Sequence, residues 1–176
     1  MFYVKVICVL LISTTSSIAQ HSHGNHDDVG VRETGQAQFA AIAEIVEILR
    51  NDASTDWGKV NIQALRDHLV DMHNVTTGST VAVNETDKSV TFTITGTEDV
   101  TRSIQEMVPA HSPMLAAATN WVVKSDLIEN GATMTIYGSN NSTRNQILGL
   151  GFFGLMTIGA HHQEHHLMIA MGRSPH

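Results

Sequence analysis

An internal repeat is the feature of this sequence that most constrains the fold. The segment Val90–Arg102 aligns without gaps on Ala132–Arg144, so that Gly96 falls on Gly138, 42 positions later. Each copy alternates apolar and polar residues as far as the glycine, which predicts a strand with one buried face followed by a helix. The identical positions are Thr91/Thr133, Thr93/Thr135, Ile94/Ile136, Gly96/Gly138, Thr101/Thr143 and Arg102/Arg144.

A further strand is predicted before each copy, at Thr80–Asn84 and at Asn120–Ser125. A polar turn follows each of them, and the second turn contains Asn130-Gly131, a hairpin signal. The repeated unit is therefore strand, strand, helix, over about 80–118 and 120–171. Two repeats are too few for a solenoid. We expect them to share one four-stranded antiparallel sheet, with the helices packed on one face.

Two amphipathic helices are predicted ahead of the repeat. Residues 36–49 place apolar side chains at helical spacing, and residues 60–74 do the same along a stripe of Ile62, Leu65, Leu69 and Met72. The expected fold class is therefore α+β, with two N-terminal helices followed by the duplicated β-β-α unit. We expect residues 35–176 to form this single domain.

The amino terminus has the pattern of a cleavable signal peptide. Lys5 precedes the short apolar run of residues 6–12, and Ser17-Ile18-Ala19 supplies a small-x-small cleavage site. We expect residues 1–19 to be removed, which takes away Cys8, and residues 20–34 to form a flexible leader containing three histidines. The expected location is periplasmic or secreted, without membrane insertion after cleavage. Four N-x-Ser/Thr sequons leave bacterial and eukaryotic origins both open.

The charge of the chain excludes one class of partner. The sequence has 10 basic and 17 acidic residues, and cleavage removes one lysine, which leaves 9 and 17, a net charge of −8 with histidine neutral. Such a surface repels phosphate backbones and anionic lipid. We therefore expect no nucleic-acid partner.

Several histidines lie on the faces of the predicted helices that are expected to be buried. His161, His162, His165 and His166 lie within six residues, on an arc that continues the apolar stripe of the last predicted helix. His111 falls in the middle of the stripe of the preceding helix, where Pro109 and Pro113 are expected to kink or end that helix. His68 and His73 are expected to point inward from the second helix.

Imidazoles that converge in this way predict a transition-metal site. The i, i+4 pairs within residues 161–166 allow two rings to reach one ion. Imidazole suits copper and zinc alike, and Met72, Met107 and Met114 favour copper because thioether is a soft ligand. We expect a protein that stores, buffers or delivers the ion and that exchanges it with a metal-donor or metal-acceptor protein. His111 and the 161–166 cluster are the expected primary ligands, with His68 or His73 completing the shell and Met72 or Met107 as optional ligands.

Two other functions use the same residues. A small oxidoreductase or hydrolase with a metal-bound water needs an acid or base beside the ion, and Asp71 and Glu164 are expected to face away. A pH-sensing interaction module would use like-charge repulsion between the clustered imidazoles. His161-x-x-Glu164-His165 resembles the inverzincin protease signature, but the chain ends about ten residues later, before the downstream glutamate ligand of that family.

Overall fold

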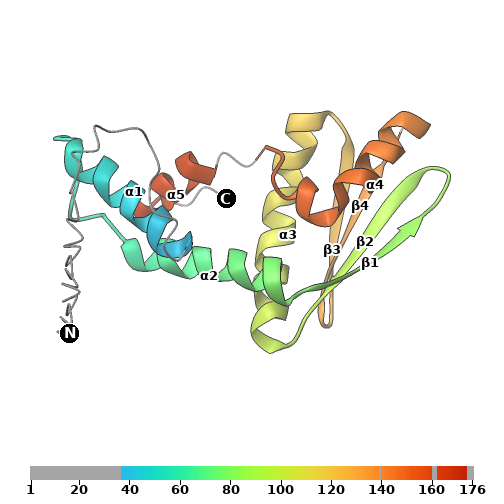
Figure 1. The fold of residues 1–176 in the computed structure, drawn as a ribbon, viewed down its shortest axis with the longest axis horizontal. Coiled ribbons are helices and arrows are strands. Elements are labelled where there is room, and N and C mark those ends of the chain that lie inside the picture. The colour runs from blue at the N-terminus through green and yellow to red at the C-terminus, as the bar shows by residue number, and fades with distance from the viewer. Residues whose placement is uncertain (1–36, 139, 160–161, 174–176) are drawn as a thin grey trace, which may run out of the picture. The chain divides into compact units, whose positions relative to one another are not determined.

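The computed structural model describes residues 37–138, 140–159 and 162–173. The chain divides into two units, Met1–Arg32 and Glu33–His176, and every described residue belongs to the second. The predicted signal peptide, the 20–34 leader and His161 lie outside the described residues. Figure 1 shows the order of the elements, α1-α2-β1-β2-α3-β3-β4-α4-α5.

The four strands form one antiparallel sheet, as the repeat predicts. They are β1 (Thr80–Glu85), β2 (Ser89–Thr95), β3 (Val122–Ile128) and β4 (Gly131–Tyr137), in the spatial order β1-β2-β4-β3. The two repeated strands, β2 and β4, are the central pair, and Phe92 lies opposite Met134. The α+β class and the four-stranded antiparallel sheet are confirmed.

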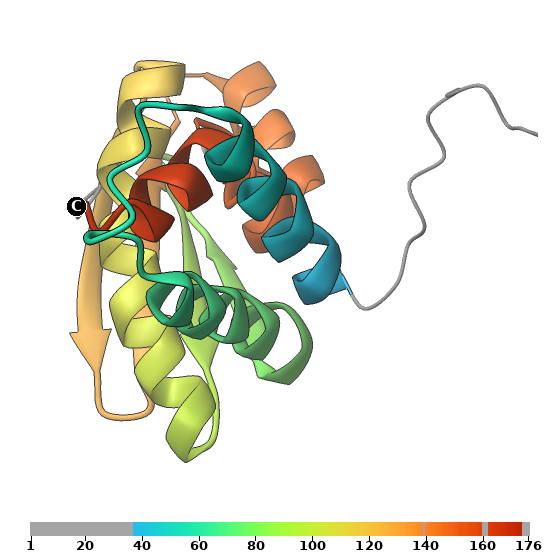
Figure 2. The ribbon, with the colours of Figure 1, turned by 90° about the vertical axis from the view of Figure 1, so that its left-hand side faces the viewer.

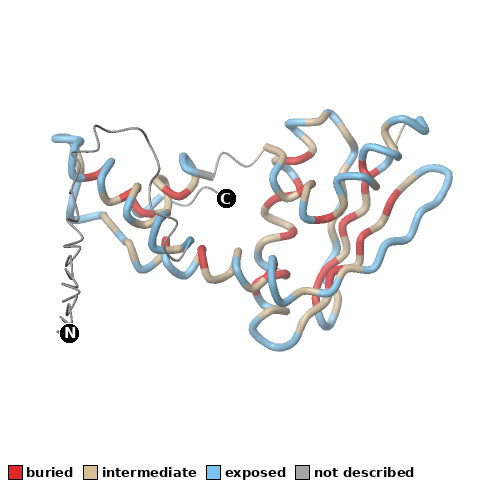
Figure 3. Tube along the Cα trace, in the orientation of Figure 1, coloured by how far each residue is buried: buried red, intermediate tan, exposed pale blue. Residues whose placement is uncertain are grey.

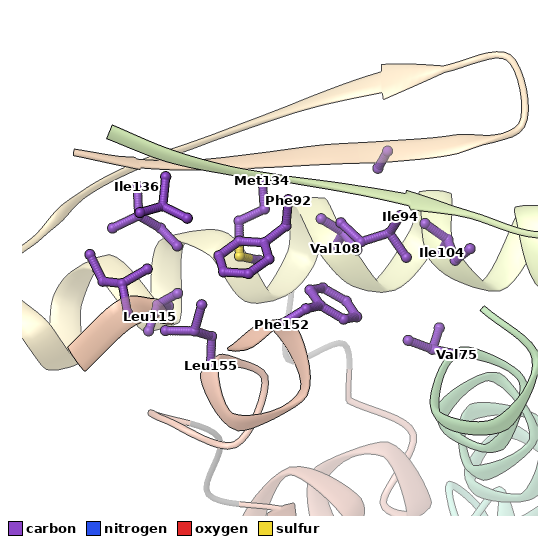
Figure 4. Packing of buried hydrophobic residues seen from close by; sticks show 13 residues of the cluster. Val75, Phe92, Ile94, Ile104, Val108, Leu115, Met134, Ile136, Phe152 and Leu155 are labelled. Carbon is purple, nitrogen blue, oxygen red and sulfur yellow. The ribbon is translucent and has the colours of Figure 1, made fainter. Parts of the chain in front are cut away.

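Alternation along the central strands produces the first hydrophobic core. Val90, Phe92 and Ile94 of β2 are fully buried, as are Ala132, Met134 and Ile136 of β4, because every second side chain points to the same face. Figure 3 shows this burial as red segments along the central strands, with exposed outer loops. The helices α3 (Glu98–Thr119) and α4 (Asn141–Leu155) supply the other side of this core. In Figure 4, Phe152 and Leu155 point toward Phe92 and Met134.

A second core is entirely helical. It is formed by α1 (Ala37–Asn51), α2 (Ile62–Gly78) and α5 (His162–Ala170). Ile45 and Leu49 of α1 pack with Leu65 of α2 and Ala170 of α5. Figure 2 shows α5, in red, beside α1 and α2. The helix α2 joins the two cores, since Val75 near its carboxyl end belongs to the core of the sheet.

The prediction of one long last helix is wrong. The helix that follows β4 ends at Leu155, and α5 is a separate helix that begins at His162. Gly151 and Gly159 adopt φ angles of +59° and +76°, which interrupt helical geometry because L-residues rarely adopt them. The helix that follows β4 therefore does not extend to residue 171, and α5 packs in the helical core.

The prolines were expected to kink or end the third helix, and they do not end it. The helix α3 runs through Pro109 and Pro113 to Thr119, and Asn120 closes it in the left-handed conformation. Val108 and Leu115, on either side of the prolines, are fully buried against the sheet. This packing offsets the backbone hydrogen bonds that the prolines remove. Over the described residues, none of the helices has both the length and the apolar character of a membrane span.

Candidate functional site

A pocket with an unusual lining lies among α2, α3, α5 and the turn that follows α4. Its volume is about 130 Å³, enough for an ion and a few water molecules. Of the ten residues that line it, nine carry a nitrogen, oxygen or sulfur atom that can bind a metal, and four of those are methionines. The lining comprises His68, Asp71, Met72, Glu106, Met107, Ala110, His111, Met114, Met156 and His165.

Three imidazole rings meet at the edge of this pocket. The ring centre of His68 lies 4.8 Å from that of His165 and 5.6 Å from that of His166, while the rings of His165 and His166 are 6.4 Å apart. His166 is 5% exposed and both of its ring nitrogens are buried. Two imidazoles bound to one tetrahedral ion through bonds of about 2.0–2.1 Å place their ring centres about 5 Å apart. His68 therefore lies at ligand spacing from His165 and from His166.

The position of α5 explains why these rings meet. Its far end is tied to the start of α2, because the Asn61 N–H donates to the Ala170 carbonyl at 2.7 Å. Leu167 and Ile169 pack against the helical core. The amide of Gln163 also donates to the carboxylate of Glu44 on α1. These contacts hold one face of α5, which carries His165 and His166, against His68.

The third helix supplies a different kind of side chain. Met107 and Met114 line the pocket from the side of α3 that faces α2, while Val108 and Leu115 face the sheet. His111 is 4% exposed, and its Nε2 lies 3.0 Å from the Leu155 carbonyl oxygen. A carbonyl oxygen only accepts, so Nε2 donates and the lone pair of the neutral ring belongs to Nδ1. His111 thus joins α3 to the end of α4 and also lines the pocket.

Asp71 corrects one expectation from the sequence. It was expected to face away from the other candidates, but it lines the pocket and accepts a hydrogen bond from Ser103 Oγ at 2.7 Å. Asn74 Nδ2 donates to the same hydroxyl at 3.1 Å, so this network joins α2 to α3. Glu106 adds a second carboxylate to the lining. Glu164 is exposed, as expected.

The expectation that His73 points inward is wrong. Its side chain is exposed and does not line the pocket. At about 100° per residue, the buried Leu65, Leu69 and Val75 direct the helix toward the Met72 side and leave His73 outside. The predicted stripe included Ile62, the first residue of the helix, and omitted the buried Val75.

Arg66 and Asp67 also lie on the exposed part of α2. The hydrogen bond from Arg66 lowers the pKa of Asp67 from its usual value.

The remaining predicted ligands divide into two groups. Met72 and Met107 line the pocket with His68, His111 and His165, so the structure brings these five together. His162 begins α5, but its side chain and all of His161 lie outside the described residues. Met156 and Glu106 were missed by the sequence analysis. No periodic signal marks Met156, because it lies in the turn after α4.

The described side chains are not arranged as a finished coordination sphere. Among residues 37–138, 140–159 and 162–173, no three His, Cys, Asp or Glu side chains already surround one point as metal ligands. The rings of His68 and His165 instead meet at an interplanar angle of 45°. No family model matches the chain, and neither the curated proteins nor the solved structures contain a significant match to it.

Proposed function

We propose that this protein binds a transition-metal ion, copper in preference to zinc, and stores, buffers or delivers it outside the cytoplasm. The single observation that carries the proposal is the meeting of His68, His165 and His166 beside a pocket lined by four methionines. The ring centres of His165 and His166 lie 4.8 and 5.6 Å from that of His68, close to the spacing of two imidazoles on one tetrahedral ion. Met72 and Met107 add soft ligands that favour copper.

The charge of the pocket supports a cation. Asp71 and Glu106 place two carboxylates in the lining, and among the described residues no Lys or Arg side chain is part of it. The Ser103 hydroxyl donates a hydrogen bond to the Asp71 carboxylate at 2.7 Å, which holds this carboxylate between α2 and α3. An entering metal ion is therefore attracted to the pocket before any ligand is bound. The first coordination sphere we propose contains His68, His165 and His166, with His111, His161 and His162 as further candidates.

The two copies of the repeat form the sheet domain beside which this site lies. We interpret β1-β2-α3 and β3-β4-α4 as two copies of one unit, and the central register supports this: Phe92 pairs with Met134, its equivalent 42 residues later. A pairing between equivalent residues is what a two-fold relation between the copies requires. The imidazoles of α2 and α5 come from outside the two copies. The site therefore combines histidines from outside the two copies with His111 and the methionines of α3, which belongs to the first copy.

Metal retention by the untagged protein tests the proposal. We expect about one equivalent of copper to remain after dialysis against micromolar free metal. The double variant His68→Ala/His165→Ala should bind at least tenfold more weakly, about 1.4 kcal/mol. His73→Ala is the matched control, because it removes an exposed imidazole from the same helix.

Two results would contradict the proposal. Retention of less than about one-half equivalent by the parent protein at micromolar free metal would remove its basis. Equal affinities for the parent and the double variant, both folded by circular dichroism, would assign binding to the exposed histidines of the chain. In that second case the chain binds metal as a short histidine tag does, without using its fold.

A metalloenzyme remains the second candidate, and Asp71 is the observation that favours it. A metal-bound water needs a neighbouring base, and Asp71 and Glu106 line the same pocket as the imidazoles. Azide added to the Cu(II) protein separates the two functions. A new charge-transfer band indicates an open coordination position for substrate, whereas an unchanged spectrum indicates a closed binding site.

A further inference from the structure

The four pocket methionines come from separate parts of the chain. Met72 belongs to α2, Met107 and Met114 belong to α3 two turns apart, and Met156 follows α4. The described residues contain seven methionines, and four of them line this one pocket. Met134, by contrast, is fully buried in the core of the sheet. The folded chain therefore concentrates thioether sulfur next to the imidazole cluster.

Most of the sulfurs come from other elements than the clustered imidazoles. The imidazoles of His68 and His165 come from α2 and α5, and three of the four sulfurs come from α3 and the turn after α4. Thioether sulfur is a soft, neutral ligand that binds cuprous copper well and contributes little to zinc or cupric copper. Imidazole binds all three ions. A mixed set of this kind distinguishes the ions by their softness.

We propose that the ion this pocket selects is Cu(I), held by thioether sulfurs of Met107 and Met114, with Met72 and Met156 beside them, together with the imidazole of His68 or His165. This inference rests on the proposed function and specifies its cargo. Neutral sulfur and imidazole ligands leave the single positive charge of the ion uncompensated. Asp71 and Glu106 in the lining supply the balancing negative charge.

Pocket geometry agrees with a small set of soft ligands. Met107 and Met114 are seven residues apart on α3, so they lie on the same side of the helix, and Ala110 between them leaves space for an ion. Met72 follows His68 by one turn of α2, which brings a sulfur and an imidazole to the same side. Three of the sulfurs, those of Met72, Met107 and Met156, also line an adjoining apolar pocket with Val75 and Phe153. This side of the site presents mainly carbon and sulfur atoms, which suit the soft cuprous ion better than a strongly hydrated ion.

Substitution of the α3 methionines tests the inference. Leucine keeps the volume and apolar character of methionine and removes the sulfur. We expect Met107→Leu/Met114→Leu to lower the Cu(I) affinity at least tenfold, measured anaerobically by competition with bicinchoninate, and to change the Zn(II) affinity less than about twofold. Met168→Leu is the matched control, because Met168 lies on α5 and does not line the pocket.

The outcomes separate this inference from the proposed function. If the double variant is folded and its Cu(I) affinity stays within about twofold of the parent, the thioethers are core side chains and the inference is overturned, while the histidine site stands. If the parent binds neither copper nor zinc, both fail. X-ray absorption of the Cu(I)-loaded parent gives a second measurement that needs no variant. Sulfur at about 2.3 Å from copper supports the inference, and a shell of nitrogen and oxygen alone overturns it.

Discussion

Replacement of Gly159 by alanine tests how the chain turns away from α4 toward α5. Gly159 has a φ of +76°, and a Cβ added there would lie 2.8 Å from the Met114 carbonyl oxygen and 3.0 Å from the Ala118 Cβ, both on α3. Real Cβ atoms do not approach backbone oxygen that closely. We therefore expect Gly159→Ala to lower the free energy of unfolding through two effects, the backbone conformation and the contact with α3.

Two other glycines of the same region separate these effects. Gly151 has a φ of +59° and a ψ of 178°, but a Cβ there would meet nothing within 4 Å. Gly151→Ala should therefore show the conformational cost alone, about 1–3 kcal/mol. Gly149 has neither feature and is exposed in α4, so Gly149→Ala should stabilise the protein by about 0.5–1 kcal/mol.

The expected cost of Gly159→Ala is then about 2–6 kcal/mol, since overpacking against α3 adds about 1–3 kcal/mol to the conformational cost of about 1–3 kcal/mol. Urea denaturation of the three variants, followed by circular dichroism, measures the differences directly. An equal loss for Gly159→Ala and Gly151→Ala would show that the turn does not press against α3. A gain for Gly159→Ala would refute the whole argument.

Two further substitutions probe the elements that carry the site. Asn61→Ala removes the side-chain oxygen that accepts from the Ala64 N–H at 2.9 Å, so it should destabilise the protein by about 1 kcal/mol in urea, and Asn61→Ser should restore most of that loss. His111→Ala should reduce the copper affinity at least tenfold, measured by competition, because His111 lines the pocket and positions the end of α4 through Leu155. Equal affinities in a folded His111→Ala protein would remove His111 from the site.

The sheet could be predicted because its signal is local and occurs twice. Alternation of Val90, Phe92 and Ile94 identifies one buried face, and the second copy repeats it at Ala132, Met134 and Ile136. When two such strands pair antiparallel, their buried side chains lie on the same face of the sheet. The strand bounds therefore differ from the predicted ones by only a few residues.

The end of α4 could not be predicted in the same way. Ile147, Leu155, Ile158 and Ile169 keep a helical spacing across the break, so periodicity alone favours one continuous helix. Glycine is tolerated inside helices, and nothing in the sequence assigns positive φ to Gly151 and Gly159. The break depends on the close approach of Gly159 to α3, which is a tertiary contact.

That break changes which histidines meet. A continuous last helix would carry His165 and His166 along the sheet toward His111 on α3. The separate α5 instead brings them to His68 on α2, a residue that the sequence ranks only as a completing ligand. His68 and Met72 form an i, i+4 pair on α2, and they line the same pocket as Met107 and His111 of α3. Of this segment the structure describes the side chains of His165 and His166, and it brings them to His68, while His111 lines the same pocket as His165. Periodicity could not rank His68 above His111, because it determines which face of a helix is buried and carries no information about the element that buries it.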